Sequence, residues 1–122
     1  MDTGKKIVIV EDDVASASEM KKFLETKGYA VSFVSDSSQA LGMIKETGPD
    51  LVLLDIIMPG LDGFTVAKQI RYDEQTKGMP IIVFSAQEGM RELFAIEGIN
   101  EYLVKPVDRE QLFEIIRKKL GQ

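Results

Sequence analysis

The sequence predicts an α/β domain: a doubly wound sheet of five parallel strands covered by five helices. Five short apolar runs rich in β-branched residues alternate with longer segments whose apolar residues recur at helical spacing. The runs are apolar throughout, which is typical of strands buried on both faces of a parallel sheet. No internal repeat or linker interrupts them, so we expect residues 1–122 to form one domain with no output domain. The pattern alone leaves the strand order open.

Each expected strand is bounded by a residue that introduces or ends extended structure. Lys6 and Glu11 flank the first run, Pro80 introduces the fourth, and Lys105-Pro106 stops the fifth. The expected strands span residues 7–10, 30–34, 51–54, 81–84 and 102–104.

Helix boundaries follow from capping and terminating residues. The first helix spans residues 14–27 and ends at Gly28, and the second lies between an Asp36 cap and a Gly48 stop. A third helix opens at residues 62–63 and gives way to a polar loop over residues 71–78. The fourth spans residues 89–97, and Asp108 caps the last.

Composition excludes several kinds of chemistry. The chain has 15 basic and 20 acidic side chains and a net charge of −5, so it carries no basic stripe for nucleic acid. It has no Cys and no His, which excludes thiolate nucleophiles, imidazole metal ligands, Ser-His-Asp triads and a phosphohistidine within the chain. The apolar run near the amino terminus is too short for a signal peptide or a membrane span. We therefore expect a cytoplasmic protein with no membrane insertion.

Polar side chains follow four of the five expected strands. Glu11 and Asp12 follow the first, Asp55 the third, Ser85 the fourth and Lys105 the fifth. The carboxyl ends of parallel strands share one edge, where α/β sheets bind ligands, so these groups should converge. Crowded carboxylates repel one another unless a cation joins them, and oxygen ligands in small number suit Mg²⁺. A lysine and Mg²⁺ together would hold a phosphoryl group.

Four motifs occur in order on these elements: IVIVEDD, DIIMPGLDG, FSA and YLVKP. Together they identify a resemblance to the response-regulator receiver domains of bacterial two-component signalling, over nearly the whole chain. The resemblance implies a flavodoxin-like sheet of order 2-1-3-4-5 and one bound Mg²⁺.

The resemblance also assigns roles at the metal site. Asp55 matches the phosphoacceptor, whose carboxylate forms an acyl phosphate. Asp12 would hold Mg²⁺ directly and Glu11 through water, with Asp55 and the backbone carbonyl of Ile57 as further ligands. Asp13 lies one position beyond the acidic pair and is expected to cap the first helix.

Three further residues match the part of the family site that senses the phosphoryl group. Ser85 matches the sensing hydroxyl, and Lys105 matches the lysine that pairs with the phosphoacceptor. Tyr102 matches the aromatic switch residue, although tyrosine also suits a half-buried edge strand. Lys105 and Pro106 would be joined by a cis peptide bond.

The function implied is that of a phosphoacceptor switch. A histidine kinase or a His-containing phosphotransfer protein would phosphorylate Asp55, and the surface of the fourth helix, fifth strand and fifth helix would change and engage a downstream protein. A dimer through that surface is compatible with the resemblance. Such a chain catalyses only its own phosphorylation and dephosphorylation, so it is not expected to be an enzyme, and no direct contact with nucleic acid is expected.

Three other functions remain to be weighed. A phosphohydrolase with an aspartyl nucleophile needs a second Asp two positions after Asp55, where this chain has Ile57. A flavodoxin-like electron carrier needs a phosphate loop after the first strand, where Glu11, Asp12 and Asp13 would repel a flavin phosphate. A receiver-like scaffold that works without phosphorylation stays open.

The interval between Ser85 and Lys105 is slightly shorter than is usual in the family, which predicts an altered loop over residues 87–90. With Leu93 buried, Phe94 and Ile96 would face outward or sideways. Either the core repacks around a shortened helix, or these two residues form an apolar partner surface.

Overall fold

The computed structural model describes residues 2–56, 61–86 and 88–122. Its five strands form one sheet of order β2-β1-β3-β4-β5 in which every neighbouring pair is parallel, as predicted. The strands are β1 (Lys6–Val10), β2 (Ala30–Val34), β3 (Leu51–Ile56), β4 (Ile81–Ser85) and β5 (Glu101–Val104).

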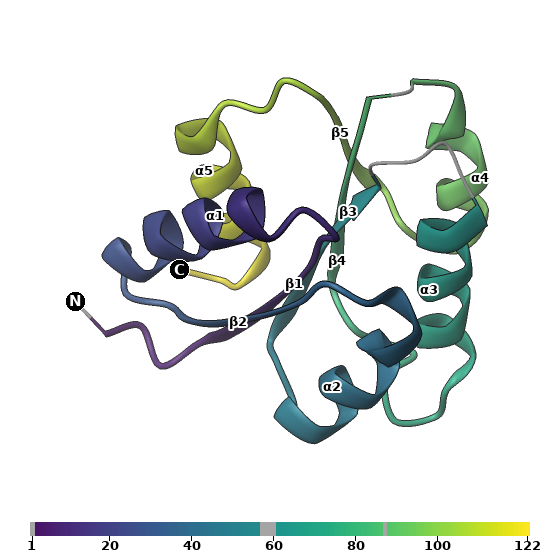
Figure 1. Ribbon diagram of the computed structural model, residues 1–122, viewed down its shortest axis with the longest axis horizontal. Coiled ribbons are helices and arrows are strands. Elements are labelled where there is room, and N and C mark those ends of the chain that lie inside the picture. The colour runs from purple at the N-terminus through teal and green to yellow at the C-terminus, as the bar shows by residue number, and fades with distance from the viewer. Residues whose placement is uncertain (1, 57–60, 87) are drawn as a thin grey trace.

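Helices cover both faces of the sheet, with α1 and α5 on one side and α2, α3 and α4 on the other (Figure 1). They are α1 (Val14–Thr26), α2 (Ala40–Thr47), α3 (Leu61–Tyr72), α4 (Arg91–Ile96) and α5 (Arg109–Lys119), with 3₁₀ turns at Ser37–Gln39 and Glu88–Met90. This is the two-sided arrangement that right-handed crossovers produce.

The core is split into two layers by the pleat of the strands. Ile7 and Ile9 of β1 pack with Leu112 on the α1/α5 side, whereas Val8 and Val10 pack on the side of α2, α3 and α4. Successive residues of a strand point to opposite faces, so the uninterrupted apolar runs fill both layers. Each fully buried aliphatic side chain contributes about 1.5–3 kcal/mol.

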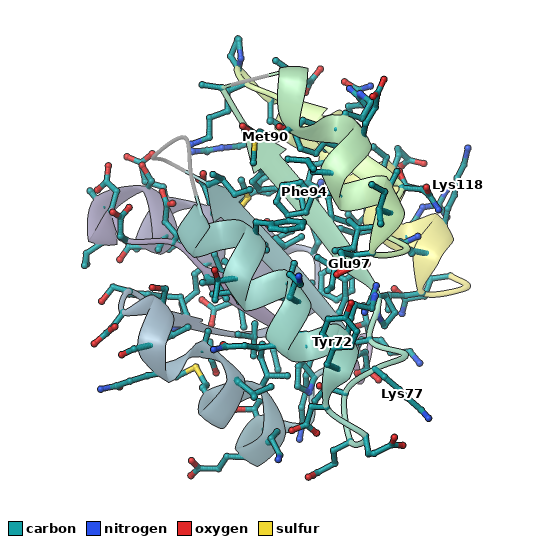
Figure 2. All side chains as sticks on the ribbon, turned by 90° about the vertical axis from the view of Figure 1, so that its right-hand side faces the viewer. Tyr72, Lys77, Met90, Phe94, Glu97 and Lys118 are labelled. Atoms are coloured by element: carbon teal, nitrogen blue, oxygen red, sulfur yellow. The ribbon has the colours of Figure 1, made fainter. Side chains whose placement is uncertain are left out.

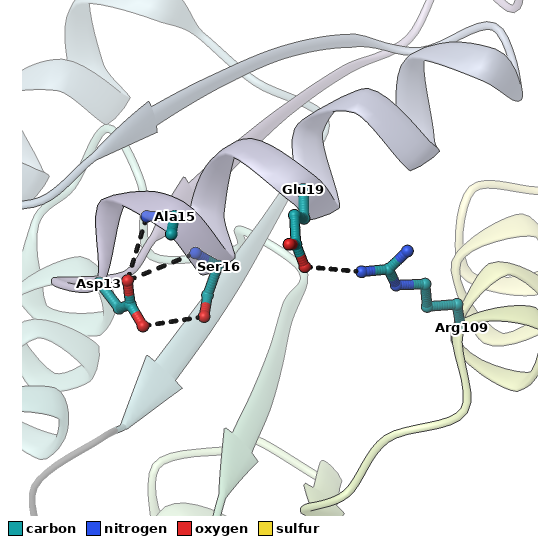
Figure 3. A network of polar contacts seen from close by, with 5 residues as sticks. All are labelled: Asp13, Ala15, Ser16, Glu19 and Arg109. Atoms are coloured by element: carbon teal, nitrogen blue, oxygen red, sulfur yellow. Dashed lines mark hydrogen bonds and ion pairs between the residues drawn. The ribbon is translucent and has the colours of Figure 1, made fainter.

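Capping residues position the helices that flank the sheet edge. The Asp13 carboxylate accepts hydrogen bonds from Ala15 N (3.0 Å), Ser16 N (3.4 Å) and Ser16 Oγ (3.0 Å), which confirms it as the cap of α1 (Figure 3). An ion pair of 3.2 Å between Arg109 and Glu19 joins α5 to α1 in the same view.

Helix α3 extends to Tyr72, so the prediction that the loop begins at residue 71 was wrong by two residues. The reason lies in the tertiary structure: the Arg71 guanidinium donates to the carbonyl oxygens of Lys77, Met79 and Glu97, at 3.3, 2.8 and 3.0 Å. These bonds hold the last turn of α3 against two loops that the local sequence does not specify.

The orientation of α4 differs from the prediction. Leu93 is 43% exposed and Phe94 is fully buried, whereas Ile96 faces outward as expected, at 78% exposed. The Phe94 ring packs edge-on against Phe64 (centroids 5.4 Å apart) and tilts against Tyr102 (5.6 Å). Burying this large ring between α3 and β5 outweighs burying Leu93. For Phe94 the structure therefore supports repacking of the core.

Helix α4 itself is shorter than predicted and begins at Arg91, after the 3₁₀ turn. Of the helices described, none is both long enough and apolar enough to cross a bilayer.

Candidate functional site

The register of the sheet brings the predicted site residues to one edge. Asp55 is paired with Phe84, Ser85 ends β4, and Glu11 and Lys105 directly follow β1 and β5. The prediction that strand ends converge is confirmed for these groups. β3 continues one residue past Asp55, so the carboxylate lies at the rim of the sheet rather than beyond it.

Asp55 and Lys105 form an ion pair, with Nζ 2.6 Å from Oδ1. Asp55 Oδ1 has no hydrogen-bond partner among the described residues, so the contact is described as an ion pair. The Asp55 side chain is 11% exposed, so much of the attraction escapes screening by water. The backbone holds the lysine in place: Lys105 N donates to Ser85 O at 2.8 Å, and the Lys105-Pro106 peptide bond is cis, as expected.

Glu11 is the most confined acid of the site. It is 3% exposed, and its Oε2 has no hydrogen-bond partner within the described part of the chain. Burial, followed by the hydrogen bond and charge of Asp55, raises the pKa of Glu11 to about 8, and the charge of Lys105 opposes this shift. With this pKa, the Glu11 carboxyl group is mainly protonated at neutral pH.

Two cavities meet at these carboxylates. The smaller, of about 90 Å³, is lined by Glu11, Asp12 and Asp55 together with Ser35, which follows β2, and Ser37, which begins the next 3₁₀ turn. The sequence analysis missed the two serines, although they follow a strand that ends at the same sheet edge. The larger cavity, of about 490 Å³, has an apolar wall that extends from Asp55 and Lys105 toward α1 and the loop before α5. That wall includes Ala17, Met20 and Val107.

The acidic site has the chemistry of a Mg²⁺ site. Its donors are all oxygens, and a cation would satisfy the buried Glu11 Oε2, which has no hydrogen-bond partner among the described residues. Across the described ranges, no three acidic side chains converge closely enough to hold an ion unaided. Mg²⁺ commonly binds one or two carboxylates directly and keeps several waters, through which a further acid can be held. The predicted carbonyl ligand of Ile57 lies outside the described residues.

Gly63 allows the start of α3 to approach the strand that carries Asp55. A Cβ at this position would overlap the side chain of Ile56, the next residue after Asp55. Glycine is therefore required for this packing, and it also lines the smaller cavity.

The two predicted switch residues are both buried. Ser85 is 1% and Tyr102 is 2% exposed. The Tyr102 ring lies between Phe94 and the Arg91 guanidinium, which is 5.1 Å from the ring centroid. The ring thus connects the interior beside β4 to the surface of α4 and β5.

Comparison with known proteins gives relatives of one kind. Protein PilH of Pseudomonas aeruginosa PAO1 is 32% identical over 118 residues, covering 95% of this chain and 98% of PilH. Response regulator PleD of Caulobacter vibrioides is 34% identical over 114 residues, and DNA-binding response regulator MtrA of Mycobacterium tuberculosis H37Rv is 34% identical over 123 residues. The matches cover 92% and 98% of this chain, but 25% of PleD and 53% of MtrA.

Solved structures agree with the sequence relatives. The receiver domain of sensor histidine kinase PA1611 from P. aeruginosa PAO1, with a magnesium ion coordinated in its active-site cleft, has a TM-score of 0.83 and 32% identity. It covers 97% of this chain and 98% of its own. A two-component response regulator from Clostridium difficile has a TM-score of 0.85 and 29% identity, covering 97% of both chains. Residues 7–117 match the response regulator receiver domain. The chain belongs to the response-regulator receiver domain family, the phosphoacceptor switches of two-component systems.

Proposed function

We propose that Asp55 is the phosphoacceptor of this receiver domain. The observation that carries the proposal is its carboxylate, 11% exposed, at the carboxyl edge of the sheet with Lys105 Nζ 2.6 Å away. In the proposed step a carboxylate oxygen of Asp55 attacks phosphorus and the bond from phosphorus to the donor's histidine nitrogen breaks. The product is an acyl phosphate on this chain and a neutral histidine on the donor.

The neighbouring residues neutralise charge in this step. Lys105 lies beside the carboxylate and would pair with an oxygen of the transferred group, and the Ser85 hydroxyl would donate to another. Glu11, Asp12 and Asp55 would hold Mg²⁺, which supplies electrostatic stabilisation of the phosphoryl oxygens when bound. Glu11 must first lose the proton that it holds at neutral pH.

The partners follow from what the chain lacks. Residues 1–122 contain no His, so the phosphohistidine lies outside them, on a histidine kinase or a His-containing phosphotransfer protein. Output passes through the surface of α4, β5 and α5, with Tyr102 as the residue that links Ser85 to that surface. The protein that binds this surface is a downstream partner or a second copy of the chain. With a net charge of −5, the chain does not contact nucleic acid directly.

We also propose that the chain acts in the cytoplasm and is not an enzyme toward other substrates. Every group with a proposed chemical role acts in the phosphorylation of this chain itself. A scaffold that needs no phosphate is the alternative that the following experiment separates.

The experiment is intact-mass analysis after incubation with a small acyl phosphate donor, with Mg²⁺ or with EDTA. Wild type should gain one phosphoryl group in Mg²⁺ alone, and Asp55→Asn should gain none. Asp13→Asn is the matched control, because Asn also caps helices and the substitution removes a neighbouring acid while keeping α1 intact. It should label like wild type. Equal labelling of Asp55→Asn and wild type would overturn the proposal.

A further inference from the structure

The larger of the two cavities beside Asp55 has an apolar wall to which the proposed function gives no role. The cavity lies on the α1/α5 side of the sheet (Figure 1), opposite the side that carries Met90 and Phe94 in Figure 2. Its volume of about 490 Å³ is typical of a site for a small organic molecule. The apolar side chains that line it are Ile9 of β1, Ala17 and Met20 of α1, Phe84 of β4, and Pro106 and Val107 before α5. This wall offers contact to a carbon chain, which neither Mg²⁺ nor a phosphoryl group has.

The polar end of the same cavity has an oxygen atom without a partner. Glu11 is 3% exposed, and its Oε2 has no hydrogen-bond partner among the described residues. Glu11 and Asp55 line both cavities, so a molecule in the larger one can reach this oxygen. A buried carboxylate oxygen requires a donor or a cation. The head group of a ligand at this end must therefore carry hydrogen-bond donors.

The charges around the cavity select a cationic head group. Glu11 and Asp55 stand where the two cavities meet, and Asp12 lines the smaller one. Lys105 lines the larger cavity, but its Nζ lies 2.6 Å from Asp55 Oδ1, so its charge is already balanced. The carboxylates repel an anionic head group, and a neutral apolar molecule leaves Glu11 Oε2 without a donor. An ammonium group supplies a positive charge and three N–H donors.

We propose that the larger cavity binds a small organic amine, with its ammonium group at Glu11 and Asp55 and its carbon chain against Met20 and Val107. Mg²⁺ uses the same carboxylates, so the amine and the ion bind in competition. The inference rests on the proposed function for the position of Mg²⁺, and it adds a class of ligand that regulates the same site.

The test is a titration of the full chain, ¹³C-labelled at the methionine methyl groups, with hexylamine hydrochloride without Mg²⁺. It is made at pH 8.5, where Glu11 is mainly ionised. The Met20 methyl signal should shift saturably. The signals of Met43 and Met90, which pack against the other core layer, should not shift (Met90 is labelled in Figure 2).

Related compounds separate the two parts of the ligand. Butylamine should bind about tenfold more weakly than hexylamine, because it lacks two methylene groups that the apolar wall would bury. Ammonium chloride lacks the chain and sodium hexanoate reverses the charge, so neither should give a saturable shift. No saturable shift of Met20 with hexylamine, or equal binding of hexanoate, would overturn the proposal.

Competition with Mg²⁺ locates the ammonium group. The Kd of hexylamine should rise in proportion to added Mg²⁺ once the ion exceeds its own Kd. Glu11→Gln should raise the Kd of hexylamine about tenfold, because it replaces a charge-assisted hydrogen bond by a neutral one. A Kd that is unaffected by Mg²⁺, or by Glu11→Gln, would reject the proposed position of the head group.

A pair of valine variants locates the carbon chain. Val107→Thr places a hydroxyl in the apolar wall and should raise the Kd about threefold. Val14→Thr makes the same change at a side chain that is 52% exposed and outside the cavity, so the Kd should stay unchanged. Equal effects of the two substitutions would contradict the proposal. Labelling without amine tests the proposed function separately, so a wild-type chain that is phosphorylated but binds no hexylamine would reject this inference alone.

Discussion

The affinity for Mg²⁺ should depend on pH through Glu11. Its pKa is raised to about 8 from an ordinary value of 4.5, first by burial and then by Asp55. A cation that binds beside Glu11 requires the ionised form, so each ion that binds displaces the proton. The chain has no His, so no other side chain of ordinary pKa titrates between pH 6 and 8.

The magnitude follows from this pKa. At pH 6.5 the protonated form of Glu11 exceeds the ionised form by a factor of about 30, so the Kd for Mg²⁺ should be about 30-fold higher than above pH 8.5. Calorimetric titration in two buffers of different ionisation enthalpy measures both the Kd and the protons released. About one proton per Mg²⁺ should be released at pH 6.5.

Glu11→Gln should remove both the pH dependence and the proton release. Glu19→Gln, which alters an exposed acid paired with Arg109, should keep both. A wild-type Kd that changes less than twofold between pH 6.5 and 8.5, without proton release, would refute the reasoning.

The same shift sets the stability of the metal-free protein. Because the folded-state pKa of Glu11 is raised, its contribution to stability is fully present below pH 4.5 and is lost as the pH rises to about 8. Hydrogen bonds are the main cause of the lowered pKa values of Asp13, Asp36 and Asp73. The stability that these three groups contribute is lost as the pH falls in the acid range, which is the opposite direction to the effect of Glu11. The Tm without Mg²⁺ should therefore fall from pH 5 to 8, and it should fall less in Glu11→Gln.

Three further predictions concern packing and charge. Phe94→Ala should lower the unfolding free energy by about 3–5 kcal/mol in urea titrations and Ile96→Ala by less than about 0.5 kcal/mol, because only Phe94 is buried; similar losses would contradict the packing of α4. Gly63→Ala should cost about 1–3 kcal/mol through overlap with the strand beside it, whereas Gly42→Ala has open space and should be stabilising by about 0.5–1 kcal/mol. Equal effects of the two glycine substitutions would show that the close approach at position 63 is not required. Lys105→Met should slow phosphoryl labelling about 100-fold, measured as the initial rate of mass gain, since it removes the cation 2.6 Å from the acceptor; an unchanged rate would separate the lysine from the reaction.

Local sequence patterns predicted the sheet and most of the site. The apolar runs defined five strands, and parallel strand ends must share an edge, so Glu11, Asp55, Ser85 and Lys105 converge as expected. Strand order came from the family resemblance, because crossover connections permit more than one order.

The features that the sequence did not predict depend on contacts between distant segments. Helix α4 has six residues, fewer than two turns, so its periodicity could not decide whether Leu93 or Phe94 faces the core. The end of α3 depends on bonds from Arg71 to residues up to 26 positions away. Ser35 and Ser37 were missed because a short polar segment after an edge strand carries no signal of its own.

The central claim is that Asp55, rather than another acid of the site, accepts the phosphoryl group. Reductive trapping of the labelled protein with borohydride, followed by peptide sequencing, measures this directly, because an aspartyl phosphate is converted to homoserine where it formed. We predict homoserine at position 55 in samples labelled with Mg²⁺. Homoserine at position 12 or 13 instead, or a labelled protein without homoserine, would contradict the claim.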